Sequence, residues 1–454
     1  MDSSKKIFED RFAEIHPALK PEEAVIEANR CLYCYDAPCV QACPTHINIP
    51  RFIKQISSGN LLGSARTILE ANALGHSCAR ACPVEVLCEG ACVFHEWQER
   101  PVDIARLQRR ATDWLRDRKI EPFKPGPENG IPVAVIGGGP AGLACANYLR
   151  RLGYRVTLFE KQKELGGLNT FGIAEYKMSK RDSLEEIERI LQLGVEVKLG
   201  VQVGRDYAAE RLFSDYRAVF VGVGLGETHR LRIPGEELKG VWDALSFIRW
   251  VKERDLKPLG KSETTVVIGA GNTAIDAVTQ SKRTGARRVV MAYRRAESQM
   301  GAYDFEYALA KSDGVEFVWN VQPTRILGKS KVEAIEFERT KMSGNKLVTV
   351  PGSKFKVDCD RVIKAIGQTK HFGLAKELGL KICDDGRIWV EPLSLRTSDP
   401  RVFAGGDAIN GGKEVVNAAA DGKRAAWAIH KALQPGVPPP PGNEYWISTI
   451  EAHA

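Results

Sequence analysis

The pattern of apolar and polar positions changes near residue 125. Before it, short stretches read as helices, with Pro21 placed to open a helix over 21–30 and Pro50 to open another. Asn60 is placed to cap the stretch LLGSARTILEANA, and IARLQRRATDWLRD (104–117) predicts a further helix. The segment 121–132 holds three prolines before Gly130 and two glycines, which is typical of a linker. The sequence therefore predicts a helical region over 1–125.

After the linker, the pattern becomes strand, glycine turn, helix, strand. It appears in VAVIGGGPAGLACANYLRRLGYRVTLFE (133–160) and again, about 130 residues later, in TTVVIGAGNTAIDAVTQSKRTGARRVVMAYRR (264–295). Two βαβ units of this kind predict an α/β protein with two nucleotide-binding domains. A strand, a GGD turn and a long helix are predicted over 401–433, and irregular structure over the proline-rich 434–446.

The first glycine motif has the spacing of a dinucleotide-binding turn. Gly137, Gly139 and Gly142 form G-x-G-x-x-G directly after an apolar strand, and Glu160 ends the next strand. Such a turn lets the backbone approach a pyrophosphate at a helix N-terminus, while the acidic residue holds ribose hydroxyls. The motif alone fits NAD or FAD.

The carboxyl-terminal segment VFAGGD favours FAD at this first site. A flavoprotein with two dinucleotides needs a second segment for the ribityl and phosphate end, and Asp407 follows a Gly-Gly turn after a strand. An equal alternative is that Asp407 only caps the following helix. The residues expected to bind FAD are Gly137, Gly139, Pro140, Ala141, Gly142, Glu160, Gly167, Leu168, Gly406 and Asp407.

The second glycine motif lacks an acidic strand end. Gly269 and Gly271 begin GAGNTAID, and the following strand ends in Arg294 and Arg295. Guanidinium groups can bind a 2′-phosphate that a carboxylate would repel, which favours NADPH over NADH. Two solvated arginines are the alternative. The residues expected to bind the nicotinamide nucleotide are Gly269, Gly271, Asn272, Thr273, Arg294 and Arg295.

Cysteine is concentrated near the amino end, where eight of the eleven residues lie between Cys31 and Cys92. The run C-x₂-C-x₄-C-x₃-C-P from Cys31 to Pro44 is close to a bacterial iron–sulfur run. Structural zinc is the rival, but its pairs usually repeat C-x₂-C, and only one such pair occurs here. Cys145, Cys359 and Cys383 are isolated and are expected to be buried small apolar residues.

Composition and charge further narrow the class of protein. The 454 residues correspond to about three domains at the usual domain size, with 43% hydrophobic and 27% charged residues. Neither a signal sequence nor an apolar run of membrane-spanning length is evident, so a cytoplasmic location with reduced thiols is expected. A net charge of +8 without a basic arm gives little support for nucleic-acid binding.

Together, the motifs RCLYCYDAPCVQACPTHINIPRFI, NALGHSCARACPVEVLCEGAC, VIGGGPAGL, VIGAGNTAID and VFAGGDA resemble the glutamate synthase small subunits and the flavin subunit of dihydropyrimidine dehydrogenase. The resemblance covers nearly the whole chain. It implies a helical domain with two [4Fe–4S] clusters over 1–125, an FAD domain over 126–240 and 366–454, and an inserted NAD(P)H domain over 241–365.

The resemblance also implies the cluster ligands. One cluster is expected on Cys31, Cys34, Cys39 and Cys92, and the other on Cys43, Cys82, Cys88 and Gln108, which leaves Cys78 spare. Gln108 favours the dihydropyrimidine dehydrogenase branch, because the glutamate synthase branch has glutamate there. A neutral amide in place of a thiolate removes one negative charge, which is expected to raise the reduction potential of that cluster.

The implied function is electron input. NAD(P)H reduces FAD, and electrons leave through the clusters to a separate FMN-containing subunit, in a hetero-oligomer, that reduces uracil or thymine to dihydropyrimidines. The reverse reaction is equally open. No side chain is nominated as a catalytic acid, base or nucleophile, since hydride transfer is the chemistry of the cofactors. The alternatives are a glutamate synthase small subunit or a related ferredoxin-linked NAD(P)H oxidoreductase, and a zinc-containing scaffold.

Overall fold

The computed structural model describes residues 8–254 and 260–452, which form two compact units. The larger unit contains His16–Thr170, Lys180–Leu225 and Lys370–Ala454, and the smaller unit contains Met1–Ile15, Phe171–Ser179 and Gly226–Thr369. The finer division into three domains with the boundaries expected above stays a prediction.

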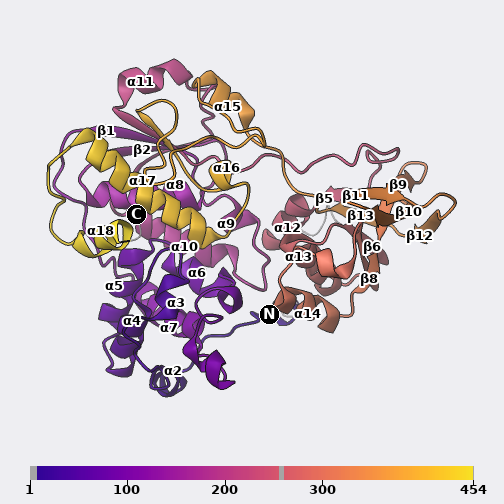
Figure 1. Ribbon diagram of the computed structural model, residues 1–454, viewed down its shortest axis with the longest axis horizontal. Coiled ribbons are helices and arrows are strands. Elements are labelled where there is room, and N and C mark those ends of the chain that lie inside the picture. The colour runs from indigo at the N-terminus through magenta and orange to yellow at the C-terminus, as the bar shows by residue number, and fades with distance from the viewer. Residues whose placement is uncertain (1–7, 255–259, 453–454) are drawn as a thin grey trace. The chain divides into compact units, whose positions relative to one another are not determined.

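The amino-terminal part of the larger unit is a cluster of short helices (Figure 1). Asn48 and Asn60 accept hydrogen bonds from the backbone N–H groups of Arg51 and Gly63 and so cap two of these helices. Phe52 and Leu107 are fully buried in the core that the helices share. The helices are α2 (Pro21–Ala28), α3 (Pro38–Gln41), α4 (Ile49–Ser57), α5 (Leu61–Ala71), α6 (Gly75–Ala81) and α7 (Ile104–Asp117).

A five-stranded parallel sheet with the order β14-β4-β1-β2-β3 forms the rest of the larger unit. Its strands are β1 (Pro132–Ile136), β2 (Arg155–Glu160), β3 (Glu196–Leu199), β4 (Ala218–Val221) and β14 (Val402–Ala404). Helix α17 packs closely against α8 beside this sheet (Figure 1). The helices of this part are α8 (Pro140–Arg151), α9 (Leu168–Phe171), α10 (Lys180–Leu191), α11 (Leu212–Asp215), α15 (Phe372–Glu377), α16 (Asp407–Asn410), α17 (Val415–Leu433) and α18 (Glu444–Glu451).

The smaller unit repeats the parallel arrangement with the strand order β5-β13-β6-β7-β8. Its strands are β5 (Val241–Asp243), β6 (Thr264–Ile268), β7 (Arg288–Tyr293), β8 (Glu316–Trp319) and β13 (Arg361–Lys364), and its helices are α12 (Ala244–Lys252), α13 (Asn272–Arg283) and α14 (Asp304–Ser312). Both βαβ units expected from the glycine motifs are therefore present, and the predicted α/β class is confirmed.

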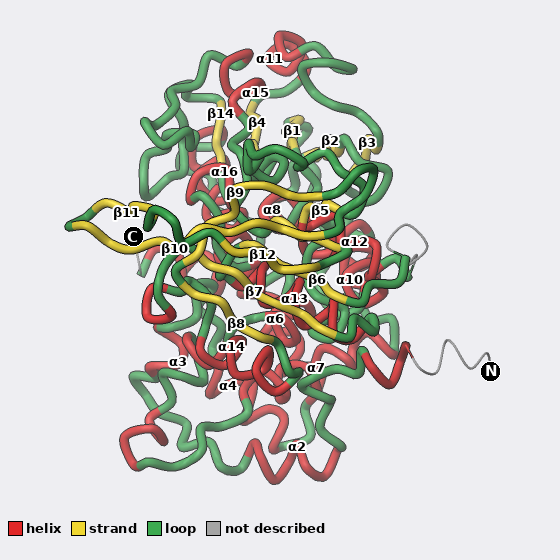
Figure 2. Tube along the Cα trace, turned by 90° about the vertical axis from the view of Figure 1, so that its right-hand side faces the viewer, coloured by secondary structure: helices red, strands yellow, loops and turns green. Residues whose placement is uncertain are grey.

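Two features were not expected from the sequence. The strands β9 (Val321–Leu327), β10 (Ala334–Ser343), β11 (Lys346–Thr349) and β12 (Phe355–Asp358) form a small antiparallel sheet, which Figure 2 shows as neighbouring yellow tubes. The tail is irregular only until Asn443, because α18 then begins and buries Trp446 against the ring of Tyr148. None of the described helices combines the length and apolar character that crossing a bilayer requires.

Candidate functional site

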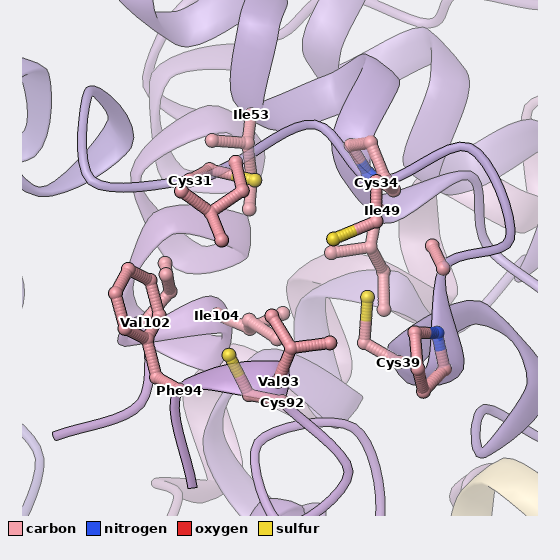
Figure 3. Close-up of a pocket in the computed structure, with 14 residues that line it drawn as sticks. Cys31, Cys34, Cys39, Ile49, Ile53, Cys92, Val93, Phe94, Val102 and Ile104 are labelled. Atoms are coloured by element: carbon pink, nitrogen blue, oxygen red, sulfur yellow. The ribbon is translucent and has the colours of Figure 1, made fainter. Parts of the chain in front are cut away.

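Four cysteines from separate segments surround one cavity in the helical part. Cys31 and Cys34 lie in the loop after α2, Cys39 lies in α3, and Cys92 directly precedes a 3₁₀ turn over Val93–Trp97. Their sulfur atoms point into a shared space (Figure 3). We call these residues the first thiol group. Apolar side chains complete the wall, among them Ile49, Ile53, Val102 and Ile104.

The first thiol group resists ionisation in the absence of a cation. Burial raises the pKa of Cys39 to about 12, and the neighbouring thiols of Cys31, Cys92 and Cys34 contribute to the rise. Burial likewise raises the pKa of Cys31. A bound metal centre removes this penalty, because its positive charge stabilises the thiolates. This donor set therefore fits a metal centre with sulfur ligands.

A second thiol group consists of Cys43, Cys78, Cys82 and Cys88. Burial raises the pKa of Cys82 and of Cys88, and thiols of the same group add to the rise in each case. Cys43 Sγ lies 3.3 Å from Thr45 Oγ1. The chain thus interleaves the two groups, since Cys39 and Cys43 are close along the sequence yet belong to different groups, while Cys92 joins the first.

Gln108 is buried on α7 next to the helix that carries Cys78 and leads to Cys82. Its amide Nε2 donates a hydrogen bond of 2.7 Å to the carbonyl oxygen of Gly75, the first residue of α6. That bond fixes the amide and leaves its oxygen without a hydrogen-bond partner among the described residues. The Cys78 thiol is also buried, and burial raises its pKa. Both side chains are therefore buried in this region, and the choice of Gln108 over Cys78 as a ligand stays a prediction.

Within the described residues, no three His, Cys, Asp or Glu side chains are arranged to hold one metal ion. The sulfur atoms of the first thiol group instead stand apart around open space (Figure 3). A [4Fe–4S] cluster is bound by four thiolates at its separate corners, whereas a structural zinc draws four ligands onto one ion at about 2.3 Å. The open arrangement fits the cluster.

Helix α6 is anchored by a carboxylate that the sequence did not reveal. Glu186 on α10 accepts hydrogen bonds from the backbone N–H groups of His76 (2.8 Å) and Ser77 (3.0 Å) at the start of α6. Asn169 Nδ2 in turn donates to Ser77 Oγ at 2.9 Å, and Asn169 follows the predicted FAD residues Gly167 and Leu168. The FAD-loop segment and the cysteine helix therefore share one buried hydrogen-bond network.

The first glycine motif adopts the geometry expected of a dinucleotide turn. Gly137 has a φ of +103°, a conformation that side chains with a Cβ rarely adopt. A Cβ on Gly142 would lie 2.0 Å from Gly137 O, so only glycine allows α8 to pack this close to the turn. Gly139 precedes Pro140 and Ala141 at the start of α8 and leaves open space beside it. That space is where a pyrophosphate can approach the helix N-terminus.

Glu160 lies at the end of β2, as expected, and is bound to the glycine turn. Its Oε2 accepts a hydrogen bond of 2.8 Å from Gly138 N, and its Oε1 accepts one of 2.7 Å from Gln162 N. A Cβ on Gly167 would lie 3.2 Å from Gly139 Cα. Leu168 begins α9. The segment around 167 thus lies directly beside the glycine turn.

Asp407 is not the N-cap of its helix, which excludes one alternative raised by the sequence. The N-cap position of α16 is Gly406, and no side chain caps it. Asp407 Oδ1 instead accepts a hydrogen bond of 3.1 Å from Lys413 N. Burial raises the pKa of Asp407, an effect that the Lys413 N–H and the charge of Lys370 oppose.

The second glycine motif is built in the same way in the smaller unit. Gly269 has a φ of +135°, Gly271 precedes Asn272 and the exposed Thr273 at the start of α13, and Asn272 Oδ1 accepts a hydrogen bond from Tyr303 N. The strand β7 leads into Arg294 and Arg295, as predicted. Arg294 is exposed, and Arg295 is half-buried with its Nε lacking a hydrogen-bond partner in the described part of the chain.

A further buried ionic cluster of the smaller unit was missed by sequence reasoning. Lys177 Nζ lies 2.7 Å from Asp276 Oδ1 and 2.6 Å from Glu306 Oε1, and Tyr176 donates to the same Asp276 oxygen. Asp276 lies on α13, which begins at the second glycine motif. The cluster attaches the segment Phe171–Ser179 to that helix, and no short-range sequence signal predicts such a long-range ion pair.

Two parts of the chain match two different known families. Residues 8–120 match the family described as dihydropyrimidine dehydrogenase domain II, 4Fe-4S cluster, and residues 131–422 match the pyridine nucleotide-disulphide oxidoreductases. The iron–sulfur and dinucleotide predictions are confirmed at this level, whereas the number of clusters stays a prediction.

Two relatives that match over nearly their whole length are subunits of two different enzymes. The small chain of glutamate synthase [NADPH] from Escherichia coli K12 is 36% identical over 94% of this chain and 95% of its own. The NAD-dependent dihydropyrimidine dehydrogenase subunit PreT from Salmonella typhimurium is 33% identical over 93% and 97%. Both names denote one part of a larger enzyme, and the identities do not separate the two branches.

Solved structures support the fold of the dinucleotide-binding part. Thioredoxin reductase from T. acidophilum matches with a TM-score of 0.54 and 21% identity, over 66% of this chain and 97% of that one. Mycobacterium tuberculosis FprA in complex with NADPH matches with a TM-score of 0.54 and 19% identity, over 71% and 90%. Together with the whole-length relatives, these findings show that the chain belongs to the family of glutamate synthase small chains and PreT-like subunits, which are NAD(P)H oxidoreductases with FAD and an iron–sulfur domain.

Proposed function

We propose that this chain is the electron-input subunit of a dihydropyrimidine dehydrogenase. Electrons from NAD(P)H pass through FAD and two [4Fe–4S] clusters to a separate FMN-containing subunit, which reduces uracil or thymine reversibly. The observation that carries this choice is Gln108, whose amide is fixed by Gly75 O beside the second thiol group. The resemblance described above places an iron-ligating glutamine at this position in that branch.

The chain's own residues bind and orient the groups that react. Bound FAD accepts a hydride and releases single electrons, which is the chemistry that couples a nicotinamide to iron–sulfur centres. The turn at Gly137–Gly142 is open to a pyrophosphate, and Glu160 fixes the shape of that turn through Gly138 N. Apolar side chains line the cavity around the first thiol group, whose four cysteines are half-buried, and such a shell limits the access of solvent to a cluster.

The second candidate is the small chain of glutamate synthase. The observation in its favour is the 36% identity to the Escherichia coli small chain, which is slightly above the 33% to PreT from Salmonella typhimurium. On that alternative Gln108 is a buried helix residue that holds Gly75 and ligates nothing.

The test is to recover the chain's physiological complex under anaerobic conditions and measure turnover. We expect a co-purifying FMN protein and NAD(P)H-dependent reduction of uracil. As a control, the chain alone should reduce artificial acceptors from NAD(P)H and leave uracil unchanged. Conversion of glutamine and 2-oxoglutarate by the complex, without uracil reduction, would establish the second candidate instead.

A further inference from the structure

Lys423 is a buried lysine on α17 with an unusual environment. It is 2% exposed, and its Nζ donates hydrogen bonds to Thr45 O at 2.7 Å and to Thr449 Oγ1 at 3.2 Å. Both acceptors are neutral, so they satisfy the hydrogen-bonding needs of the ammonium group without balancing its charge.

The other buried lysines that the structure describes each have a carboxylate nearby. Lys364 Nζ lies 2.8 Å from Glu236 Oε1, and Lys252 Nζ lies 4.0 Å from Glu175 Oε2. No carboxylate of the described residues lies within ion-pair distance of Lys423. Because a buried charge is costly unless it is paired, Lys423 calls for a negative partner.

The cavity that Lys423 lines does not supply this partner from protein side chains. His46, Arg387, Lys413 and Arg424 line the same cavity, and Asp421 is its one carboxylate among the described residues. Asp421 Oδ2 accepts a hydrogen bond of 2.9 Å from Gly406 N, and Asp421 Oδ1 lies 4.0 Å from Arg424. The cavity as a whole is therefore positive.

Lys423 is connected to the second thiol group through Thr45. Thr45, which accepts the shorter hydrogen bond, is two residues from Cys43, and its Oγ1 lies 3.3 Å from Cys43 Sγ. Burial lowers the pKa of Lys423 to about 7, and a negative charge at Cys43 opposes this shift and so favours the ammonium form. The missing negative charge is thus found where a cluster with thiolate ligands is expected.

We propose that Lys423 is the fixed counter-charge of a [4Fe–4S] cluster bound through Cys43, and that it raises the reduction potential of that cluster. Reduction adds one electron, and hence one negative charge, to the cluster, which a buried positive charge favours in a low-dielectric interior. Lys423 contacts no reacting atom. It acts by holding a positive charge near the cluster. The inference rests on the second cluster of the proposed function.

The test is an anaerobic redox titration of the purified chain, with the clusters followed by electron paramagnetic resonance. Lys423→Met keeps much of the side-chain length and removes the charge. We expect the equilibrium constant for reduction of one cluster to fall at least tenfold, which is about 59 mV for one electron, while the other cluster is unchanged. Lys423→Arg should restore most of the potential.

Lys431→Met is the matched control, because Lys431 lies on the same helix but is exposed. It removes an equal charge that solvent already screens, so both potentials should stay as in the wild type. An unchanged potential in a fully loaded Lys423→Met chain overturns the inference. So does a shift of the same size in Lys431→Met.

Iron and sulfide content distinguishes failure of the inference from failure of the proposed function. Two clusters correspond to roughly eight iron atoms per chain. About four iron atoms in the wild type would mean that the second cluster is absent, and the inference would fail with it. If the cluster does not assemble in Lys423→Met, the reduction potential is measured in Lys423→Gln instead. Loss in both neutral variants with retention in Lys423→Arg supports the role of charge, whereas loss in all three shows a steric role and overturns it.

Discussion

Cys78, a member of the second thiol group, and Gln108 beside that group are both buried, and only Gln108 of the two is expected to bind iron. Gln108→Ala should therefore lower the iron content from roughly eight toward four per chain, because a Cys₃ set leaves one iron without a protein ligand. Cys78→Ser should leave the iron content unchanged, because Cys78 is the spare thiol of the expected ligand sets. Iron and sulfide analysis of anaerobically purified variants decides the matter, and the reverse pattern would exchange the two residues in the ligand set.

Arg294 and Arg295 are expected to decide the preference between the two nicotinamide nucleotides. Replacing both by Ala should raise the KM for NADPH roughly tenfold or more, since charge-assisted hydrogen bonds contribute about 1.5–3 kcal/mol, and should change the KM for NADH little. Their backbone carbonyls accept hydrogen bonds from Thr340 Oγ1 and Asn320 N, so strand β7 should keep its end without the guanidinium groups.

Arg287→Ala is the matched control for the nucleotide test, because Arg287 is exposed just before the opposite end of β7. Its replacement should affect neither nucleotide. Steady-state kinetics with an artificial acceptor measures all of these constants. Equal losses with NADPH and NADH in the double variant would mean that the pair is only solvated.

At the scale of elements, the helical part is joined to α10 by a buried ion-pair network around Asp113. Burial raises the pKa of Asp113, but the charges of Arg80 and Arg116 and the hydrogen bond from Arg80 outweigh this and hold the pKa below its usual value. Arg80 and Arg116 also contact Asp182 on α10, at 3.3 and 3.1 Å. The network therefore attaches the cysteine-bearing helices to the first dinucleotide-binding part within the larger unit.

This network predicts that the stability of the folded state depends on pH in the acid range. The folded state keeps Asp113 charged to a lower pH than the unfolded chain does, so its stabilisation is complete above an unfolded pKa of about 3.9. The stabilisation fades as the pH falls through the lower folded pKa. Asp113→Asn should cost about 3 kcal/mol at neutral pH and should weaken this loss in acid.

Urea denaturation of the holoprotein between about pH 3 and 7 measures the effect across this titration. The matched control is Asp206→Asn, since Asp206 also has a lowered pKa but forms an exposed pair with Arg205. Exposed pairs contribute little, so this variant should follow the wild type. A similar loss of stability in both variants would contradict the importance assigned to the buried network.

Sequence patterns predicted elements well where the signal is local. The range 104–117 is that of α7, and Asn60 caps α5 as expected. Glu186 and Lys177 could not be found in this way, because their partners lie 109 and 129 residues away in the bonds to Ser77 and Glu306. Such pairs depend on which elements the folded chain brings together. The helix α18 was missed because the prolines before it hid the anchoring role of Trp446.

For the whole molecule, the cofactor sites were predictable as motifs, whereas their grouping was not. Spacing alone marked eight thiols as an iron–sulfur region, and the two glycine turns as nucleotide sites. The separation of the thiols into two groups needed the resemblance to a family, since it depends on the path of the chain between 44 and 92. The choice between two enzyme branches likewise depends on one side chain, Gln108, and on a partner outside this chain.

The short helix α3 separates Cys39 from Cys43 by a single turn, and each of these residues belongs to a different thiol group. With the two clusters of the proposed function, whichever centre is built first would immobilise a ligand of its neighbour and lower the entropic cost of completing it. In the wild-type chain, assembly of one centre should therefore favour assembly of the other.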